Sequence, residues 1–312
     1  GRTGIKQDRT SRARGVKRWR GAGNGPTRRV RLRSHRSTAM HLIFDPCWSG
    51  PLTALMALAM LAYVIIAWRG GAWSETHSQR AMTLAWALHA FTVWGSLSTD
   101  TGAPRFGFAP ALSATAWLVL TFYTLERHWF PQLGARLVLS GMGAVTVALS
   151  MLFPGQPMHL QASPWLSLHL MFGIASYGLF AAAVVHAVLM TRTEHLIRKA
   201  VEVQGTLPFL VLERLTFRFV YAGFALLTAT LVMGMIFGEQ LYGPGHAWRW
   251  DHKPVFALLS WLTFAALLWA RFRMGWRGKK ALRVLYTGAA FLLLSYVGSR
   301  FVLEVLLGRP GT

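Results

Sequence analysis

Eight apolar stretches, each close to the length that crosses a lipid bilayer, constrain this chain more than any other feature of its sequence. A transmembrane helix needs roughly 20 mostly apolar residues, because each residue adds 1.5 Å along the helix axis. Glycines, prolines and a basic run at residues 271–280 separate the stretches. They lie at residues 51–68, 80–98, 107–125, 135–153, 164–190, 215–238, 254–270 and 282–307. We therefore predict an all-α, polytopic membrane helix bundle with about eight transmembrane helices.

The composition agrees with a membrane protein and excludes several other classes. Only 14% of the 312 residues are charged and 53% are hydrophobic, whereas a soluble domain carries about 25% charged residues. An excess of 33 Lys and Arg over 11 Asp and Glu can indicate nucleic acid or an anionic membrane surface as the partner. The apolar body favours the lipid bilayer, and we expect no nucleic acid. One cysteine, Cys47, excludes an intramolecular disulfide, a CxxC pair and a multi-cysteine metal cluster.

Residues 1–39 form a basic leader that differs from the rest of the chain. The leader contains eleven Arg and two Lys against a single acid, Asp8, and shows no apolar period, so we expect it to be disordered. It is either a nucleic-acid- or lipid-binding tail, or upstream sequence placed before a start at Met40, the first methionine. We favour the second interpretation and assign the transmembrane domain to residues 40–312.

Lysine and arginine in the connections predict the orientation, because these residues stay on the cytoplasmic side of a membrane. Connections after the second, fourth and sixth stretches hold three basic residues, namely Arg105, Arg249 and Lys253. Connections after the odd-numbered stretches hold thirteen, namely Arg69, Arg80, Arg127, Arg136, Arg192, Arg198, Lys199, Arg214, Arg271, Arg273, Arg277, Lys279 and Lys280. This bias predicts that both termini lie outside.

Four histidines lie in or at the edge of the apolar stretches, where an imidazole costs free energy unless it is hydrogen-bonded or ligated. The predicted depths sort them into an outer couple, His169 with His252, and an inner couple, His89 with His186. His186 follows His169 by 17 residues on one helix, roughly 25 Å, so these two cannot share a metal ion. Two facing imidazoles suit a six-coordinate haem iron. Alternatively, each imidazole bonds a carbonyl or hydroxyl of a neighbouring helix, and the residues alone leave both possibilities open.

Aromatic and charged residues gather beside His252. Trp248, Trp250 and Trp261 cluster at the predicted outer edge, where indoles form an interfacial belt or stack on a planar ligand such as a porphyrin. A belt does not require Asp251, His252 and Lys253 next to them. Candidate partners for haem propionates are Arg249, Lys253 and Arg300. Arg300 has a competing partner at helical spacing in Glu304.

Two stretches of the sequence resemble the cytochrome c assembly protein family, a family of membrane haem-handling proteins. One is LHLMFGIASYGLF, Leu168 to Phe180, which is similar to a family span with a His followed by a Ser-Tyr step. The other is WRWDHKPVFALLSWLTFAALLWARFRMGWRG, Trp248 to Gly278. It resembles the family's tryptophan-rich outer loop, a Trp-containing span and a Gly-Trp-Arg-Gly turn. The resemblance covers residues 40–308 and is strongest to the small eight-span, inner-membrane branch often labelled YpjD-like.

The resemblance implies haem binding, here as haem b, in the bacterial inner membrane, and a part in cytochrome c maturation beside other membrane proteins of that process. His169 matches the family's outer-side haem-ligand histidine. The larger synthases carry a fuller tryptophan run and further histidines, whereas here the within-span position is Trp269 and no His follows His252. With fewer matched ligands and no thiol pair, the chain is expected to bind or relay haem rather than to act as an enzyme.

Two other classes of function remain open at this point. An electron-transfer cytochrome b would also use bis-histidine haems at two depths. A structural or regulatory membrane protein would bind no haem and satisfy its histidines within the bundle. The sequence shows no Ser-His-Asp set, paired carboxylates, phosphate loop or zinc pattern that would support a hydrolase or a kinase.

Overall fold

The computed structural model describes residues 50–97, 105–130, 135–157, 164–199, 209–238 and 252–306. Almost all of these residues are helical, which confirms the all-α prediction. The leader, residues 1–39, and the outer-loop residues Trp248, Arg249, Trp250 and Asp251 lie outside the described ranges.

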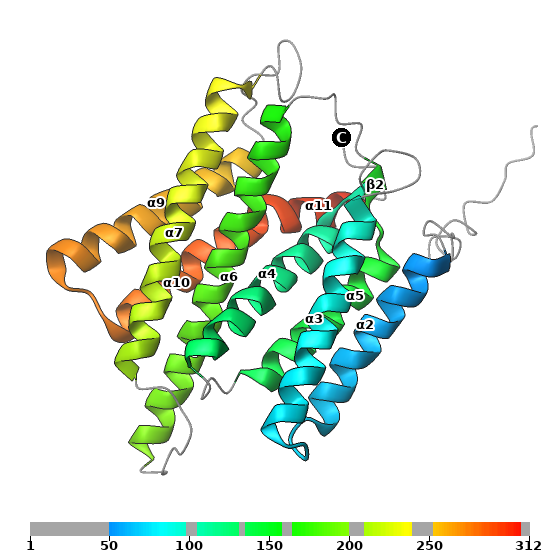
Figure 1. Cartoon of the computed structure of the whole chain (residues 1–312). Coiled ribbons are helices and arrows are strands. Elements are labelled where there is room, and N and C mark those ends of the chain that lie inside the picture. The colour runs from blue at the N-terminus through cyan, green and yellow to red at the C-terminus, as the bar shows by residue number, and fades with distance from the viewer. Residues whose placement is uncertain are drawn as a thin grey trace, which may run out of the picture. The chain divides into compact units, whose positions relative to one another are not determined.

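The described helices follow one another up and down the bundle (Figure 1). They are α2 (Gly50–Arg69), α3 (Glu75–Leu97), α4 (Phe108–Trp129), α5 (Arg136–Leu152), α6 (Pro164–Arg198), α7 (Phe209–Ile236), α9 (His252–Met274) and α10 (Gly278–Leu293). The last helix continues as two π-helical segments, η1 (Leu294–Gly298) and η2 (Val302–Leu306), around a short turn, α11 (Ser299–Phe301). Two short strands, β1 (Arg105–Phe106) and β2 (Gln156–Pro157), pair antiparallel.

Each predicted apolar stretch corresponds to one described helix, and the chain is a polytopic membrane protein. Six of these helices are long and apolar enough to cross a bilayer. The other two are α3, which begins with polar residues from Glu75 to Arg80, and α5, which has 17 residues. The stretches underestimated helix length most for α6, which extends to Arg198. The β1–β2 pair was not anticipated, because a two-residue bridge between distant segments leaves no periodic signal.

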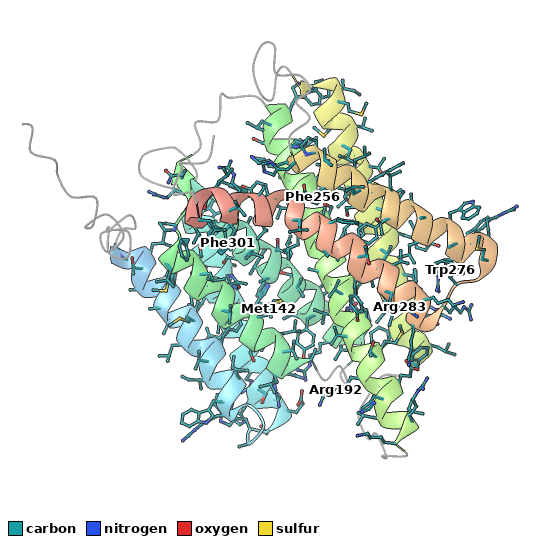
Figure 2. The ribbon with its side chains drawn as sticks, turned by 180° about the vertical axis from the view of Figure 1, so that it is seen from behind. Met142, Arg192, Phe256, Trp276, Arg283 and Phe301 are labelled. Carbon is teal, nitrogen blue, oxygen red and sulfur yellow. The ribbon has the colours of Figure 1, made fainter. Side chains whose placement is uncertain are left out.

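The helices pack as two groups that α4 and α6 join. In the first group α2 contacts α3 and α5, and α4 contacts α3 and α5. In the second group α6 packs along α7, and the α9–α10 hairpin lies against both of them. Figure 1 and Figure 2 show this hairpin running obliquely to α6 and α7.

A stack of two phenylalanines holds the four helices of the second group together. The rings of Phe180 on α6 and Phe264 on α9 lie parallel, with their centroids 3.8 Å apart, and both side chains are fully buried. Gly223 on α7 lies under the Phe180 ring, since a Cβ there would be 3.2 Å from it. Gly288 on α10 lies under the Phe264 ring at 2.9 Å. The stack therefore fits only because two backbones carry no side chain at these positions.

Polar contacts also connect the last helix to its neighbours. Ser260 on α9 donates to the carbonyl of Gly288, 2.9 Å away. The Tyr177 hydroxyl on α6 donates to the carbonyl of Leu292, just before η1. Ser295 in η1 donates to the carbonyl of Lys253 at 2.9 Å. A π-helical turn takes backbone groups out of the regular i to i−4 hydrogen-bond pattern of an α-helix. The segment η1 lies where the hydrogen bonds from Tyr177 on α6 and to Lys253 on α9 come together.

The turn between α9 and α10 depends on glycine. Gly275 and Gly278 have φ of 63° and 60°, in the left-handed region that glycine favours. Gly275 follows the last residue of α9, the position at which helices commonly end on such a glycine. The Gly-Trp-Arg-Gly sequence is thus a chain reversal, and Arg271 supports it through the Trp276 carbonyl at 3.4 Å.

Basic residues gather at one end of the bundle. All thirteen basic residues of the odd-numbered connections are described, and they lie at or near the helix ends where α2, α4, α6 and α9 finish. Figure 2 shows Arg192 and Arg283 toward this end, with Phe256 and Phe301 toward the other. The fold thus brings together the charges on which the predicted orientation rests, and we call this the basic end.

Cysteine labelling in intact cells tests the orientation. In a Cys47→Ser background, a cysteine replacing exposed Gln156 should react with an impermeant maleimide, because the positive-inside rule puts this end outside. A cysteine replacing exposed Lys279, at the basic end, should react only after permeabilisation. The reverse pattern would overturn the orientation.

Gly288→Ala tests the phenylalanine stack. The new Cβ would lie 2.9 Å from a buried ring that cannot move away, so we expect a loss of about 1–3 kcal/mol in unfolding free energy. Gly141→Ala is the control, because nothing lies within 4 Å of a Cβ on that α5 glycine and the change should be neutral or slightly stabilising. Equal effects of the two changes in detergent unfolding curves would show that the stack does not limit the fold.

Candidate functional site

His169 lies between α6 and α7, about one turn from the start of α6. Its ring is hydrogen-bonded to the backbone of Thr230 on α7 and lies near Gly234, where an added Cβ would be 3.6 Å from His169 Cε1. The Nδ1 atom is buried and has no hydrogen-bond partner among the residues that the structure describes. A buried polar atom without a partner costs about 1–3 kcal/mol, so this nitrogen lies where an additional ligand would satisfy it.

Two aromatic pairs lie along α7, and the first of them is close to His169. Trp165, four residues before His169 on α6, stacks on Phe237 of α7 with centroids 4.3 Å apart and an interplanar angle of 9°. Further along α7, Trp261 of α9 stacks on Phe224, ten residues or roughly 15 Å from Gly234, with centroids 5.5 Å apart. The Trp261 indole also donates to Thr228 at 2.9 Å. The aromatic surface nearest His169 is therefore the Trp165–Phe237 stack, which is flat in the way that a planar aromatic ligand requires.

His252 lies at the same end of the bundle as His169, as their predicted depths required. It is the exposed first residue of α9. The next residue, Lys253, anchors the start of α9 to η1 through Ser295. No contact joins His169 to His252 within the described ranges, and Trp248, Trp250 and Asp251 lie outside them. The pairing of His169 with His252 through one iron therefore stays a prediction.

Arg300 forms the ion pair with Glu304 that their helical spacing indicated. Its guanidinium is buried, with Nη1 4.0 Å from Glu304 Oε1. The same guanidinium lies 5.9 Å from the Tyr296 ring. Glu304 also faces the backbone before α4, since a Cβ on Gly107 would lie 3.1 Å from Glu304 Oε2. These contacts connect the π-helical segments to α4 and give no support to a role of Arg300 toward a propionate.

His89 is fully buried, and both of its ring nitrogens have partners from other helices. Its Nε2 lies 2.9 Å from the Ser113 hydroxyl on α4. Its Nδ1 lies 3.3 Å from the Tyr63 hydroxyl on α2. Tyr63 in turn packs against Gly143 on α5, where a Cβ would lie 2.9 Å from the ring. His89 thus connects the first helical group, as the alternative interpretation of the histidines expected.

His186 has separate partners near the basic end. Its Nδ1 lies 2.8 Å from the Ala182 carbonyl, one turn earlier on α6. Its Nε2 lies 2.8 Å from Glu126 Oε2 on α4. The angles at Nε2 fall short of hydrogen-bond geometry, but the two buried polar atoms lie in direct contact.

The structure therefore does not arrange His89 and His186 as facing iron ligands, unlike the predicted inner couple. The predicted depths were only approximate, and the side-chain partners of both histidines lie on other helices. Glu126 was missed, although an acid at the edge of an apolar stretch is itself a signal of a functional or paired group.

Comparison with known protein families shows to which family the chain belongs. The family model described as Cytochrome C assembly protein matches residues 76–307, from α3 to the end of the last helix. The chain belongs to this family. Inner membrane protein YpjD of Escherichia coli K12 is 26% identical over 172 residues, 54% of this chain. That match covers 64% of the YpjD length.

Two further relatives carry the name cytochrome c biogenesis protein CcsA. The protein of Synechococcus sp. WH7803 is 30% identical over 231 residues, with 60% of this chain and 71% of the relative covered. The protein of Trichodesmium erythraeum is 36% identical over 88 residues, covering 28% of this chain and 24% of the relative. No solved structure matches the chain significantly.

The family resemblance maps onto the second helical group. Leu168 to Phe180 lies within α6 and includes both His169 and the stacked Phe180. The described part of the second stretch forms α9 and the turn to Gly278. Trp269, where larger members carry a histidine, is 58% exposed on α9. Its side chain therefore faces the surroundings rather than the site near His169.

A double-mutant cycle tests the pairing of His186 with Glu126. His186→Leu and Glu126→Leu each leave one buried polar group without its partner, and each should cost about 1–3 kcal/mol. The double variant should lose less than the sum, with a coupling of about 0.5–3 kcal/mol in detergent unfolding curves. The exposed Arg198–Glu194 pair is the control and should couple by less than about 0.5 kcal/mol. Similar coupling in both cycles would contradict the buried pair.

Proposed function

We propose that this protein binds haem in the membrane and takes part in cytochrome c assembly, as a haem-handling or relay protein without catalysis of its own. The observation that carries the proposal is the buried, unpartnered Nδ1 of His169 among the described residues. It lies within the region that the family model matches. The relatives named for cytochrome c biogenesis support the assignment to that process.

The residues present fit a haem. His169 offers a nitrogen that needs a partner, and His252 is exposed on the first turn of α9 at the same end. The stacked rings of Trp165 on α6 and Phe237 on α7 lie near His169 and suit a porphyrin face. When bound, haem supplies an iron that accepts imidazole nitrogens as axial ligands. We propose haem b, because a chain with a single cysteine lacks the CxxCH attachment of a c-type haem.

The alternative of an electron-transfer cytochrome with two bis-histidine haems receives less support. Such a protein needs a second facing pair, and both nitrogens of His89 contact Tyr63 and Ser113. His186 contacts the Ala182 carbonyl and Glu126. The described geometry favours one haem rather than two. Rapid reduction of the purified haem protein by a quinol would favour the electron-transfer alternative.

The proposal includes the location and the partners. The name of the Escherichia coli relative supports the bacterial inner membrane as the location. The positive-inside rule predicts that the His169 end faces outside. Other membrane proteins of cytochrome c maturation are the partners that this assignment implies. With the basic end on the cytoplasmic side, haem would be held near the face where c-type cytochromes are completed.

Haem content and spin state of the detergent-purified protein test the site. His169→Ala and His252→Ala should lower haem per chain in a pyridine haemochrome assay, or convert a six-coordinate low-spin spectrum to a five-coordinate high-spin one. His186→Ala should leave the spectrum unchanged, because it lies roughly 25 Å away on the same helix. His195→Ala, an exposed histidine at the opposite end of α6, is the matched control.

The outcomes separate the parts of the proposal. Unchanged haem content and spin state in folded His169→Ala and His252→Ala would exclude the outer couple. Loss in His169→Ala alone would keep His169 as a ligand and exclude His252. A protein that purifies without haem, and does not take up added haem, would favour the structural alternative.

A further inference from the structure

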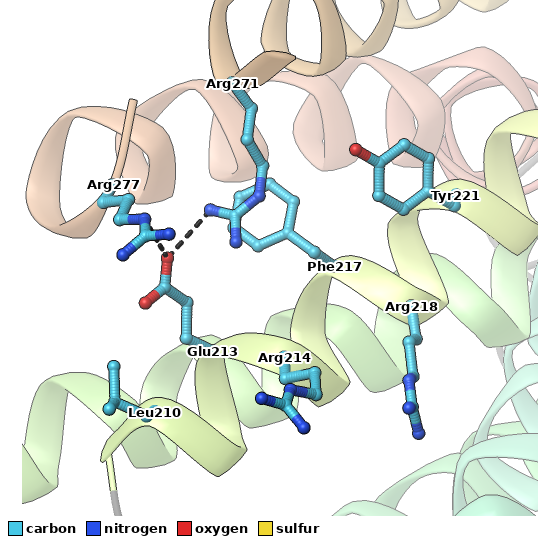
Figure 3. Close-up of a pocket in the computed structure, with 8 residues that line it drawn as sticks. All are labelled: Leu210, Glu213, Arg214, Phe217, Arg218, Tyr221, Arg271 and Arg277. Atoms are coloured by element: carbon cyan, nitrogen blue, oxygen red, sulfur yellow. Dashed lines mark hydrogen bonds and ion pairs between the residues drawn. The ribbon is translucent and has the colours of Figure 1, made fainter. Parts of the chain in front are cut away.

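A cavity of about 380 Å³ opens at the basic end, beside the first turns of α7 and the α9–α10 turn (Figure 3). Its volume lies at the lower end of the roughly 300–1,000 Å³ that is usual for small-molecule sites. Four arginines and a single carboxylate line it: Arg214, Arg218, Arg271, Arg277 and Glu213. The excess of cations indicates an anionic ligand.

Glu213 fixes two of the arginines as a wall of the cavity. Its buried carboxylate Oε1 lies 2.8 Å from Arg271 Nη1 and 3.8 Å from Arg277 Nε. The Arg271 guanidinium also lies 3.5 Å from the centroid of the Phe217 ring. These contacts hold Arg271 in place on the α7 side and neutralise Glu213. The acid is therefore no obstacle to an incoming anion.

Arg214 and Arg218 are the arginines available to a ligand. They lie one turn apart on the same face of α7, and no described residue forms an ion pair or hydrogen bond with either. Both are exposed, and Figure 3 shows them extending away from the Glu213 ion pair. Two neighbouring guanidinium forks match the oxygen atoms of a phosphate group.

The borders of this face are apolar and open to the membrane. Leu210, one turn before Arg214, is 66% exposed, and Tyr221, just beyond Arg218, is 50% exposed. Phe272 on α9 is 83% exposed at the same end of the bundle. Leucine and aromatic side chains beside arginines form a boundary between acyl chains and headgroups. A water-soluble anion would gain nothing from this border, whereas a phospholipid would.

We propose that this cavity binds the phosphate of an anionic phospholipid from the cytoplasmic leaflet, with Arg214 and Arg218 as the phosphate ligands and Tyr221, deeper in the membrane, against the acyl chains. Basic pockets between transmembrane helices on the cytoplasmic side are a known physical solution for such headgroups. This proposal does not depend on haem binding.

Lipid-dependent thermal stability of the full chain in a neutral detergent tests the site. Added phosphatidylglycerol should raise the Tm of the wild type in a saturable way, because a ligand that binds the folded state stabilises it. Phosphatidylcholine and soluble glycerol phosphate should not do so at the same concentrations. In Arg214→Gln/Arg218→Gln, the phosphatidylglycerol concentration for half the effect should rise at least about tenfold, since two charge-assisted contacts are lost.

Arg273→Gln/Arg283→Gln is the matched control. It removes the same charge from exposed positions at the same end that do not line the cavity, and it should respond to lipid as the wild type does. Equal losses in both double variants would show general surface attraction and overturn the site. An equal effect of soluble glycerol phosphate would overturn the lipid as the ligand.

A second measurement keeps the test valid if the variant is less stable. Native mass spectrometry counts phosphatidylglycerol retained per folded chain. The wild type and the control should retain it, and Arg214→Gln/Arg218→Gln should not. Retention equal to that of the wild type would overturn the proposal.

Discussion

The contact of aromatic rings with glycine backbones is the constraint on which the rest of this bundle depends. Phe180 and Phe264 form a single stack between Gly223 and Gly288, so one column of side chains fixes α6, α7, α9 and α10. Tyr63 repeats the arrangement over Gly143 in the first group. Lipid tails are as apolar as phenylalanine, so burial alone does not drive these helices together. Close backbone approach supplies dispersion contacts instead, and only glycine permits it here.

The packing register between α6 and α7 that positions Phe180 also positions His169. Phe180 lies over Gly223, and His169 lies over Gly234. His169 is eleven residues before Phe180 on α6, and Gly234 is eleven residues after Gly223 on α7, about three turns in each helix. In antiparallel helices these steps are equivalent, so one packing register positions both rings, roughly 16 Å apart. The imidazole therefore lies three turns from Phe180 in the same packing register, where it is hydrogen-bonded to Thr230 while its Nδ1 has no described partner.

Periodicity and charge were sufficient to predict the helices and the clustering of basic residues at one end. They were also sufficient to indicate the Arg300–Glu304 pair, because its partners are four residues apart. The environments of His89 and His186 were not predictable in this way. Tyr63 and Ser113 are 26 and 24 residues from His89, and Glu126 is 60 residues from His186. Whether a membrane histidine is a ligand or a structural group depends on such remote partners, which composition and spacing do not specify.

His89, His169 and His186 then divide according to what the fold already provides. His89 bridges three helices and His186 joins α6 to α4, so removing either leaves a buried partner exposed to an apolar surrounding. His169 is hydrogen-bonded to the backbone of Thr230 on α7, but its Nδ1 has no described partner. The fold therefore needs His89 and His186 for its own stability, whereas His169 has a nitrogen to offer a ligand. This difference ties haem affinity to His169 and bundle stability to the other two, so the two properties should respond to separate substitutions.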